Sequence, residues 1–253
     1  MLSFSEWGNG HALVFIHAFP LDSSMWQAQI EFFRERYRVI TPDVPGFGAS
    51  QPARSWTMHE MGEQLAALLD HLGIEKCTLA GLSMGGYISL PFALAHPTRV
   101  ERLVLAHTRA RADNETERSA RNAMIDELQR DGNAALAEKM LPRLLSPDAS
   151  AGVRDFVRAS IRKTSAQACI HAVTAMRDRT DQTGQLGNLH CPSLVIAGSG
   201  DAILKVEDCE KMAAAIPGGE FVVIPRTGHL SNLEDPEAFN LSLEGFLKRS
   251  DSK

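Results

Sequence analysis

The sequence predicts an α/β protein whose mostly parallel sheet is covered by helices on both faces. Short apolar runs bounded by Gly, Pro or Asp recur along the chain, and most are apolar at both odd and even positions, which is typical of strands in a covered parallel sheet. Segments with helical periodicity separate these runs, and this alternation builds parallel sheets through right-handed crossovers. The predicted strands are residues 12–16, 38–42, 77–81, 102–106, 193–197 and 221–225.

The most clearly defined helix begins after Thr57. Glu60 follows three residues later, so these two residues can form a capping box, and apolar residues at helical spacing continue as far as Leu72. Gly73 then ends the helix, because glycine readily adopts the left-handed conformation found at helix C-termini. Further helices are predicted at residues 23–35, 84–95, 206–216 and 236–249.

A long stretch between the strands at 102–106 and 193–197 interrupts this alternation. It is charged, rich in alanine and helical in pattern, and it is much longer than an ordinary crossover connection or a set of helices that only covers the sheet. We therefore expect residues 108–189 to form a helical cap of about four helices inserted into the body. Residues 1–107 and 190–253 would then form the α/β core.

Composition excludes several classes of protein. The chain has 253 residues, of which 44% are hydrophobic, so it is not a disordered chain, and its net charge of −5 gives no attraction to nucleic acid. It contains no apolar run of the ~18 residues that a membrane span needs, and its first residues do not resemble a secretory signal. The 4 cysteines are scattered without paired spacing, which favours free thiols and a cytoplasmic location.

The strongest chemical motif is Gly81-Leu82-Ser83-Met84-Gly85, a GxSxG sequence. The motif alone occurs by chance, but here a predicted strand ends just before Ser83 and a predicted helix begins just after it. A sharp strand-to-helix turn of this kind exposes the serine oxygen at the edge of the sheet. The pattern therefore predicts Ser83 as a nucleophile; the alternative is an ordinary turn serine.

A serine nucleophile needs a base, and a histidine base needs a carboxylate to orient it. Asp201 follows the strand at 193–197, and His229 follows the last strand, at 221–225. The carboxyl ends of parallel strands share one edge of the sheet, so both side chains are expected beside Ser83. The alternatives are a turn aspartate, with Asp208 as a weaker substitute, and a surface histidine.

Four other residues are candidates for lining a substrate pocket: His17, Trp26, His107 and Leu230. His17 fits better as a structural residue bonded to backbone, and Trp26 fits either a pocket or the core. His107 is either a pocket residue or a polar residue at a strand end. The histidines lie without the close pairing that metal sites use, so the sequence predicts no metal.

The chain resembles the α/β-hydrolase fold superfamily, and within it the small bacterial-type esterase and enol-lactonase group. The resemblance implies a doubly wound, mostly parallel sheet with a helical cap inserted after the sixth strand. It also implies Ser83 as nucleophile, Asp201 as acid and His229 as base, with the backbone N–H groups of Phe19 and Met84 forming an oxyanion hole. The matching segments are FIHAFPLDSSMW (15–26), TPDVPGFGAS (41–50), GLSMGG (81–86), AGSGDAI (197–203) and GHLSNLEDPEAF (228–239).

Two positions bear on that resemblance. The family usually has glycine where this chain has Ala18, and a methyl group is tolerated there if φ is negative. Some relatives carry the acid after the preceding strand, and the corresponding residue here is His107, which favours Asp201 as the acid.

These observations predict a serine hydrolase that cleaves small carboxylic esters through an acyl-enzyme, without a cofactor. A lactonase acting on enol-lactones or acyl-homoserine lactones is the alternative, followed by perhydrolase, C–C hydrolase and hydroxynitrile lyase chemistry. A serine at this position argues against dehalogenases and epoxide hydrolases, which need aspartate. A non-catalytic ligand receptor on the same scaffold stays open. The expected partner is a small ester or lactone, with no nucleic acid or membrane, and the chain is expected to be a monomer or homodimer.

Overall fold

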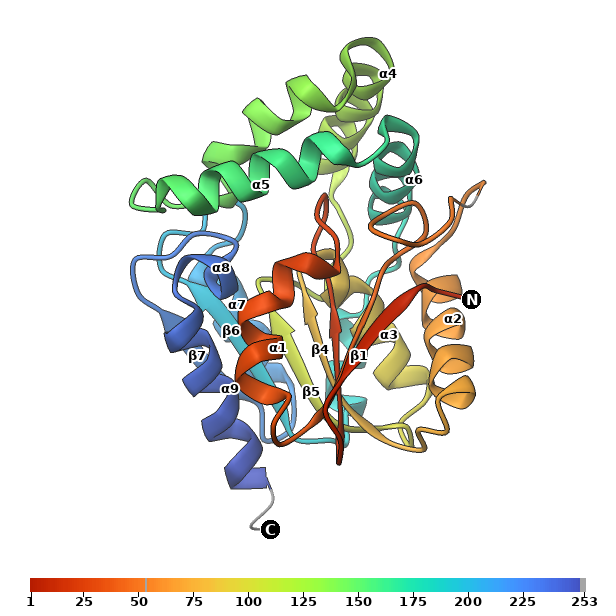
Figure 1. Cartoon of the computed structure of the whole chain (residues 1–253), viewed down its shortest axis with the longest axis vertical. Helices are drawn as coiled ribbons and strands as arrows, with labels where there is room; N and C mark the ends of the chain where they lie inside the picture. The colour runs from red at the N-terminus through yellow and green to blue at the C-terminus, as the bar shows by residue number, and fades with distance from the viewer. Residues whose placement is uncertain (53, 251–253) are drawn as a thin grey trace.

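The computed structural model describes residues 1–52 and 54–250, which form a central seven-stranded sheet (Figure 1). The strands lie in the order β1-β3-β2-β4-β5-β6-β7; only β1 is antiparallel to its neighbour. Their bounds are β1 (Phe4–Trp7), β2 (Ala12–Ile16), β3 (Arg38–Pro42), β4 (Cys77–Leu82), β5 (Val100–Ala106), β6 (Ser193–Gly198) and β7 (Glu220–Ile224). The predicted fold class is confirmed.

The central strands are buried on both faces. Every residue of β2, β4 and β6 is buried, which explains why these strands are apolar at odd and even positions alike. The sequence did not reveal β1, because this edge strand has only four residues and its middle two, Ser5 and Glu6, are exposed. It is held by its pairing with β3 rather than by an apolar pattern of its own.

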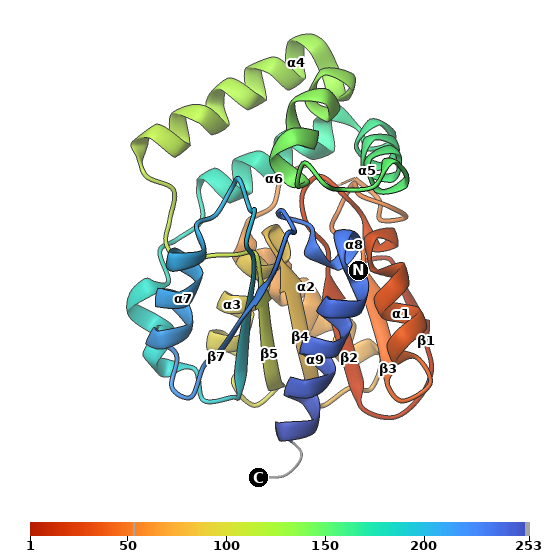
Figure 2. The ribbon, with the colours of Figure 1, turned by 90° about the vertical axis from the view of Figure 1, so that its left-hand side faces the viewer.

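The body helices lie on the two faces of the sheet. Helices α1 and α9 cover one face, and α3 and α7 cover the other (Figure 2), while α2 packs against α3. Their bounds are α1 (Gln27–Phe33), α2 (Met58–His71), α3 (Met84–Ala95), α7 (Val206–Ala215), the short α8 (Ser231–Glu234) and α9 (Pro236–Ser250). The predicted capping box is present: Thr57 Oγ1 accepts from Glu60 N–H, and the Glu60 carboxylate accepts from Thr57 N–H.

Helices α4 (Glu115–Leu144), α5 (Ala151–Lys163) and α6 (Ala166–Arg177) stack above the carboxyl ends of the strands (Figure 1). We call residues 108–189, which contain them, the cap. Gly132, with φ of 69°, divides α4 into two helices joined by a kink. The cap was expected after a sixth strand, but it follows β5, the fifth strand of the described residues. Only one strand, β1, precedes β2.

Within the described residues, no helix is both long and apolar enough to cross a membrane. The four cysteines are free thiols. Burial raises the pKa of Cys77, Cys169 and Cys209 to about 12, so these thiols stay protonated at neutral pH and do not serve as nucleophiles.

Candidate active site

Ser83 lies at the sharp turn between β4 and α3. Its φ of 55° is in the left-handed region, which is uncommon for a residue with a side chain and costs about 1–3 kcal/mol. Several hydrogen bonds hold the turn: Ser83 N–H donates to Ala106 O (2.9 Å), and Thr108 Oγ1 donates to Ser83 O (2.9 Å). The surrounding structure therefore imposes the strained conformation.

Two glycines of the motif allow the turn to pack. A Cβ atom on Gly81 would lie 2.3 Å from Gly85 O, and one on Gly85 would lie 2.2 Å from Ile16 O. Both contacts are with backbone, which cannot move aside as a flexible side chain can. Helix α3 therefore begins directly against the end of β2, beside the loop that contains Phe19.

Asp201 and His229 come together at the carboxyl ends of β6 and β7. His229 Nδ1 lies 2.8 Å from Asp201 Oδ2, and both side chains are buried. The other carboxylate oxygen, Oδ1, accepts hydrogen bonds from the backbone N–H groups of Ile203 (2.8 Å) and Leu204 (3.0 Å). The carboxylate is thereby fixed in position opposite the imidazole.

Burial acts to raise the pKa of Asp201. The neighbouring imidazoles His229 and His107 outweigh this effect through charge and hydrogen bonding, and they hold that pKa well below its usual range. One imidazole nitrogen of His107, one of His229 and a carboxylate oxygen of Asp201 lie within 4.8 Å of one another. Both Nδ1 atoms are within hydrogen-bond distance of one oxygen, so the cluster is organised as donors around a carboxylate.

Ser83 and His229 line the same cavity, which has a volume of about 280 Å³ and lies between the body and the cap. Phe19, Tyr87 and Ile203 also line the body side of this cavity. The cap side is formed by Arg109 and Asp113 before α4, by Met176 of α6 and by residues of α4, which are Glu117, Ala120, Arg121, Ala123, Met124, Lys139, Met140, Arg143 and Leu144. We call this space the serine cavity.

The loop after β2 brings Phe19 to the serine cavity. The φ of Ala18 is not positive, so its methyl group causes no strain that a glycine would relieve. His17 braces the loop from behind: its Nε2 accepts from Val44 N–H (3.0 Å), and its Nδ1 lies 3.1 Å from Ala18 O. Met84 is the first residue of α3, where backbone N–H groups have no partner within the helix.

None of the four predicted pocket candidates is among the described residues that line the serine cavity. His17 is occupied by the backbone bonds just described. Trp26 packs in the core against Phe15 (ring centroids 4.8 Å apart) and Phe239 (6.0 Å). Leu230 is buried at the start of α8. His107 is buried against Asp201, with its Nδ1 3.0 Å from Oδ2. Hydrogen bonds hold His17 and His107 in place, whereas Trp26 and Leu230 pack in the core.

The His229 loop is attached to the cap. His229 N–H donates to Leu144 O at the end of α4 (2.9 Å). Glu234 adds a bridge, since one carboxylate oxygen accepts from Gly228 N–H (2.8 Å) and the other from Ser146 N–H (2.9 Å). The backbone around His229 is therefore positioned partly by cap residues.

Sequence reasoning did not identify the charged residues of the serine cavity. Four cations line it, Arg109, Arg121, Lys139 and Arg143, together with the anions Asp113 and Glu117. The dense charges of the segment TRARADNETERSAR (108–121), directly after a strand end, were the available signal. Of these cations, Arg143 is exposed and forms no ion pair with the described residues.

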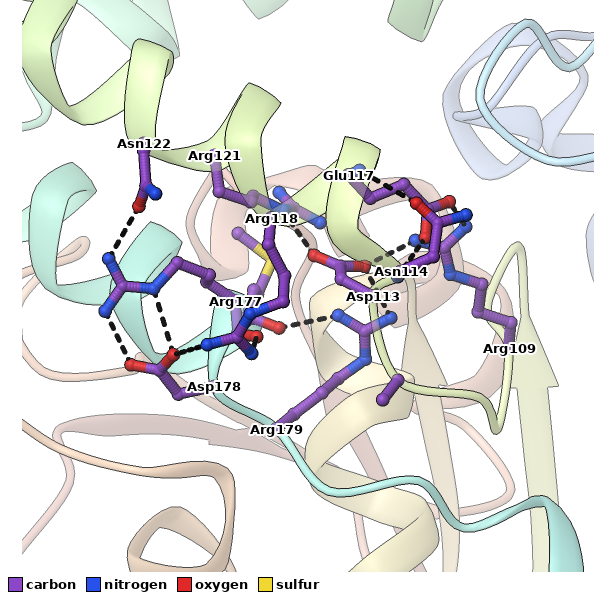
Figure 3. A network of polar contacts seen from close by, with 12 residues as sticks. Arg109, Asp113, Asn114, Glu117, Arg118, Arg121, Asn122, Arg177, Asp178 and Arg179 are labelled. Atoms are coloured by element: carbon purple, nitrogen blue, oxygen red, sulfur yellow. Dashed lines mark hydrogen bonds and ion pairs between the residues drawn. The ribbon is translucent and has the colours of Figure 1, made fainter.

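A network of ion pairs joins the two ends of the cap (Figure 3). The buried carboxylate of Asp113, just before α4, contacts Arg109 (2.6 Å), Arg121 (3.1 Å) and Arg179 (2.8 Å), and Arg179 follows α6. Arg109 also reaches Glu117 (2.7 Å). The residues that lead into the cap and out of it are thus held side by side.

A second cavity of about 610 Å³ adjoins the serine cavity. Tyr87 and Arg109 line both cavities, so they form part of the wall between them. The Arg179 guanidinium lies over the Tyr87 ring, 4.1 Å from its centroid, and holds that wall in place.

The ion pairs of Glu117 predict that the free energy of unfolding depends on pH. Hydrogen bonding from Arg111, together with other nearby groups, lowers the pKa of Glu117 from 4.5 to about 2. A carboxylate with a lowered pKa stabilises the folded chain above its unfolded pKa, and this contribution is lost as pH falls from about 4.5 toward 2. In urea denaturation, Glu117→Gln should therefore be less stable than the wild type at pH 7, and the difference should shrink across that window. A difference that stays constant with pH would contradict this assignment.

Comparisons with known proteins agree with this fold. A family model described as alpha/beta hydrolase fold matches residues 11–236. The chain is 30% identical to 3-oxoadipate enol-lactonase 2 of Acinetobacter baylyi over 254 residues, covering 98% of this chain and 93% of that protein. An esterase structure from Thermogutta terrifontis superposes with a TM-score of 0.95 at 38% identity (98% and 93% covered). An enol-lactonase structure from Burkholderia xenovorans gives 0.91 at 26% identity (98% and 96% covered).

Proposed function

Because the chain belongs to the α/β hydrolase fold family, we propose that it is a serine hydrolase that cleaves carboxylic esters of small acyl groups. One observation carries the proposal: Ser83, on a strained turn, shares a cavity with His229, which is hydrogen-bonded to the buried carboxylate of Asp201. Nucleophile, base and orienting acid are the three roles that acyl transfer to water needs. The esterase and enol-lactonase relatives support the same class of reaction.

In the proposed mechanism, Ser83 Oγ attacks the ester carbonyl and its proton passes to His229 Nε2. Asp201 holds the His229 Nδ1–H and stabilises the imidazolium that forms. The N–H groups of Phe19 and Met84 stabilise the oxyanion, each by about 3–4 kcal/mol in comparable enzymes. His229 then protonates the leaving alcohol, and a water molecule repeats the cycle on the acyl-enzyme. Residues 108–189 act in this proposal as the cap that selects the substrate.

A second candidate function is lactone hydrolysis, and the charge of the serine cavity favours it. Four cations and two anions line this cavity, so its wall carries a net positive charge. An enol-lactone of 3-oxoadipate carries a carboxylate in addition to its lactone bond, and the guanidinium of Arg143 offers donors of the right geometry for such a group. The same serine chemistry would open the lactone, with the alcohol remaining attached to the acyl group.

A substrate panel tests both candidates. Across a series of p-nitrophenyl esters from acetyl to decanoyl, we expect sustained turnover of the short-chain members. We also expect a fluorophosphonate to label Ser83, read by mass spectrometry of the peptide. Lactones with and without a carboxylate substituent belong in the same panel. A higher kcat/KM for carboxylated lactones than for every simple ester would favour the lactonase. Labelling of Ser83 without sustained turnover of any ester or lactone would contradict both enzyme functions and favour a ligand receptor.

A further inference from the structure

His107 occupies a position in the site that the mechanism above does not use. It directly follows β5 and has φ of 48°, a left-handed conformation that residues with side chains seldom adopt. Its backbone N–H donates to Ile196 O of β6 (2.8 Å), and its side chain is fully buried. A polar, buried residue in an unfavourable conformation needs compensating interactions, and both of its ring nitrogens make them.

The two contacts of the ring define its protonation state. His107 Nδ1 lies 3.0 Å from Asp201 Oδ2, and His107 Nε2 lies 2.6 Å from Ser231 Oγ. An ionised carboxylate can only accept, so Nδ1 carries the proton and Nε2 accepts from the Ser231 hydroxyl. Burial lowers the pKa of His107, which favours this neutral form. The Asp201 carboxylate thereby selects the tautomer, and the Ser231 hydroxyl donates to the other ring nitrogen.

One oxygen of Asp201 thus receives two imidazole donors. His229 Nδ1 is 2.8 Å from Oδ2 and His107 Nδ1 is 3.0 Å from the same atom, with the two rings edge to face and their centroids 5.5 Å apart. The two amide donors on Oδ1 fix the other side of the carboxylate. The second imidazole restricts rotation of the carboxylate. Its N–H donor also partly offsets the negative charge that acts on His229.

We propose that His107 is a positioning residue, which acts through Asp201 to hold the carboxylate against His229 and to limit the charge that His229 experiences. The proposal rests on the proposed function, in which His229 is the base. His107 itself does not line the serine cavity, and its ring is hydrogen-bonded to Asp201 and Ser231 rather than to Ser83 or His229. Its effect should therefore appear in the pH dependence of the reaction and in kcat more than in KM.

The charged groups around His107 set the direction in which its loss should shift the pH profile. Among the described residues, the titratable groups that face its ring are Asp201 and His229. Cys209 of α7 lies against the neighbouring Thr108, with Sγ 3.9 Å from the carbonyl oxygen, and stays neutral. Without the His107 donor, the full charge of Asp201 acts on His229 and favours its protonated form. The acid limb of the kcat/KM profile should then move to higher pH.

Two substitutions separate positioning from packing. His107→Leu removes the donor, whereas the side-chain amide of His107→Asn can place an N–H near the position of Nδ1. We expect the leucine variant to lose about tenfold in kcat and to shift the acid limb upward by about 0.5–1 pH unit. The asparagine variant should retain most of the kcat and the wild-type limb. Equal profiles in the two variants, or an unshifted limb in both, would overturn the proposal.

Further variants keep the test decisive. If His107→Leu does not fold, His107→Phe replaces it: the ring is kept but the donor to Asp201 is lost, so the limb should move in the same direction, and an unmoved limb would overturn the proposal. Ser83→Ala, assayed in parallel, separates the two hypotheses. Unchanged turnover in that variant would refute the proposed function, whereas its inactivity together with unaltered His107 variants would refute only the role of His107.

Discussion

Replacing Ser83 with alanine is expected to lower kcat for ester hydrolysis by about 10⁵-fold, because the reaction loses the atom that forms the acyl-enzyme. The residual rate would come from binding and the oxyanion donors alone. Alanine keeps the Cβ atom, so the left-handed turn and its backbone hydrogen bonds should persist. Steady-state kinetics on the best ester of the panel measures the effect, and far-ultraviolet circular dichroism checks that the fold is intact.

A matched control lies on the same helix. Ser89 is also a buried serine of α3, and its hydroxyl donates to Gly85 O (2.8 Å), but it does not line the serine cavity. Ser89→Ala should retain kcat within about threefold, since only one local hydrogen bond is lost. Comparable activity in the Ser83→Ala and wild-type proteins would refute the serine mechanism, whatever the control shows.

Gly85→Ala is expected to lower the free energy of unfolding by more than about 3 kcal/mol. The added Cβ would lie 2.2 Å from Ile16 O and 3.1 Å from His17 O, both backbone atoms at the end of β2. Relief of this overlap requires α3 to move away from the sheet, and the turn at Ser83 moves with it. Urea denaturation gives the loss of stability, and the loss of activity should accompany it.

Gly187→Ala serves as the matched control for that substitution. Gly187 is exposed in the segment after α6, its φ is not positive, and nothing lies within 4 Å of the added Cβ atom. We expect a change in unfolding free energy within about 0.5 kcal/mol. If Gly85→Ala were as stable as this control, the close approach of α3 and β2 would not be a constraint on the fold.

Features that depend on neighbouring residues in the sequence were predictable. The capping box at Thr57 and the strand-to-helix turn at Ser83 both follow from residues a few positions away in the sequence. The convergence of Asp201 and His229 was predictable as well, because strand ends of a parallel sheet share one edge. Local sequence and the strand order of a parallel sheet are sufficient to predict these features.

Other features depend on contacts that no local pattern encodes. His107 and Asp201 are 94 positions apart, and their hydrogen bond follows from the order of β5 and β6 in the sheet. Trp26 faces Phe239 of α9, and only the packing of α1 and α9 on one face of the sheet assigns it to the core. The cavity-lining residues of the cap depend on how α4 and α6 sit over the sheet, which helical periodicity alone does not determine.

The hydrogen bond from His229 N–H to Leu144 O has a consequence for how substrate enters. The end of α4 cannot lift from the body without releasing the backbone of the proposed base and the Glu234 bridge beside it. Cap closure and base alignment are therefore thermodynamically linked, and a ligand that favours one favours the other by the same factor. An open cap would therefore leave the proposed base less well aligned than a closed one.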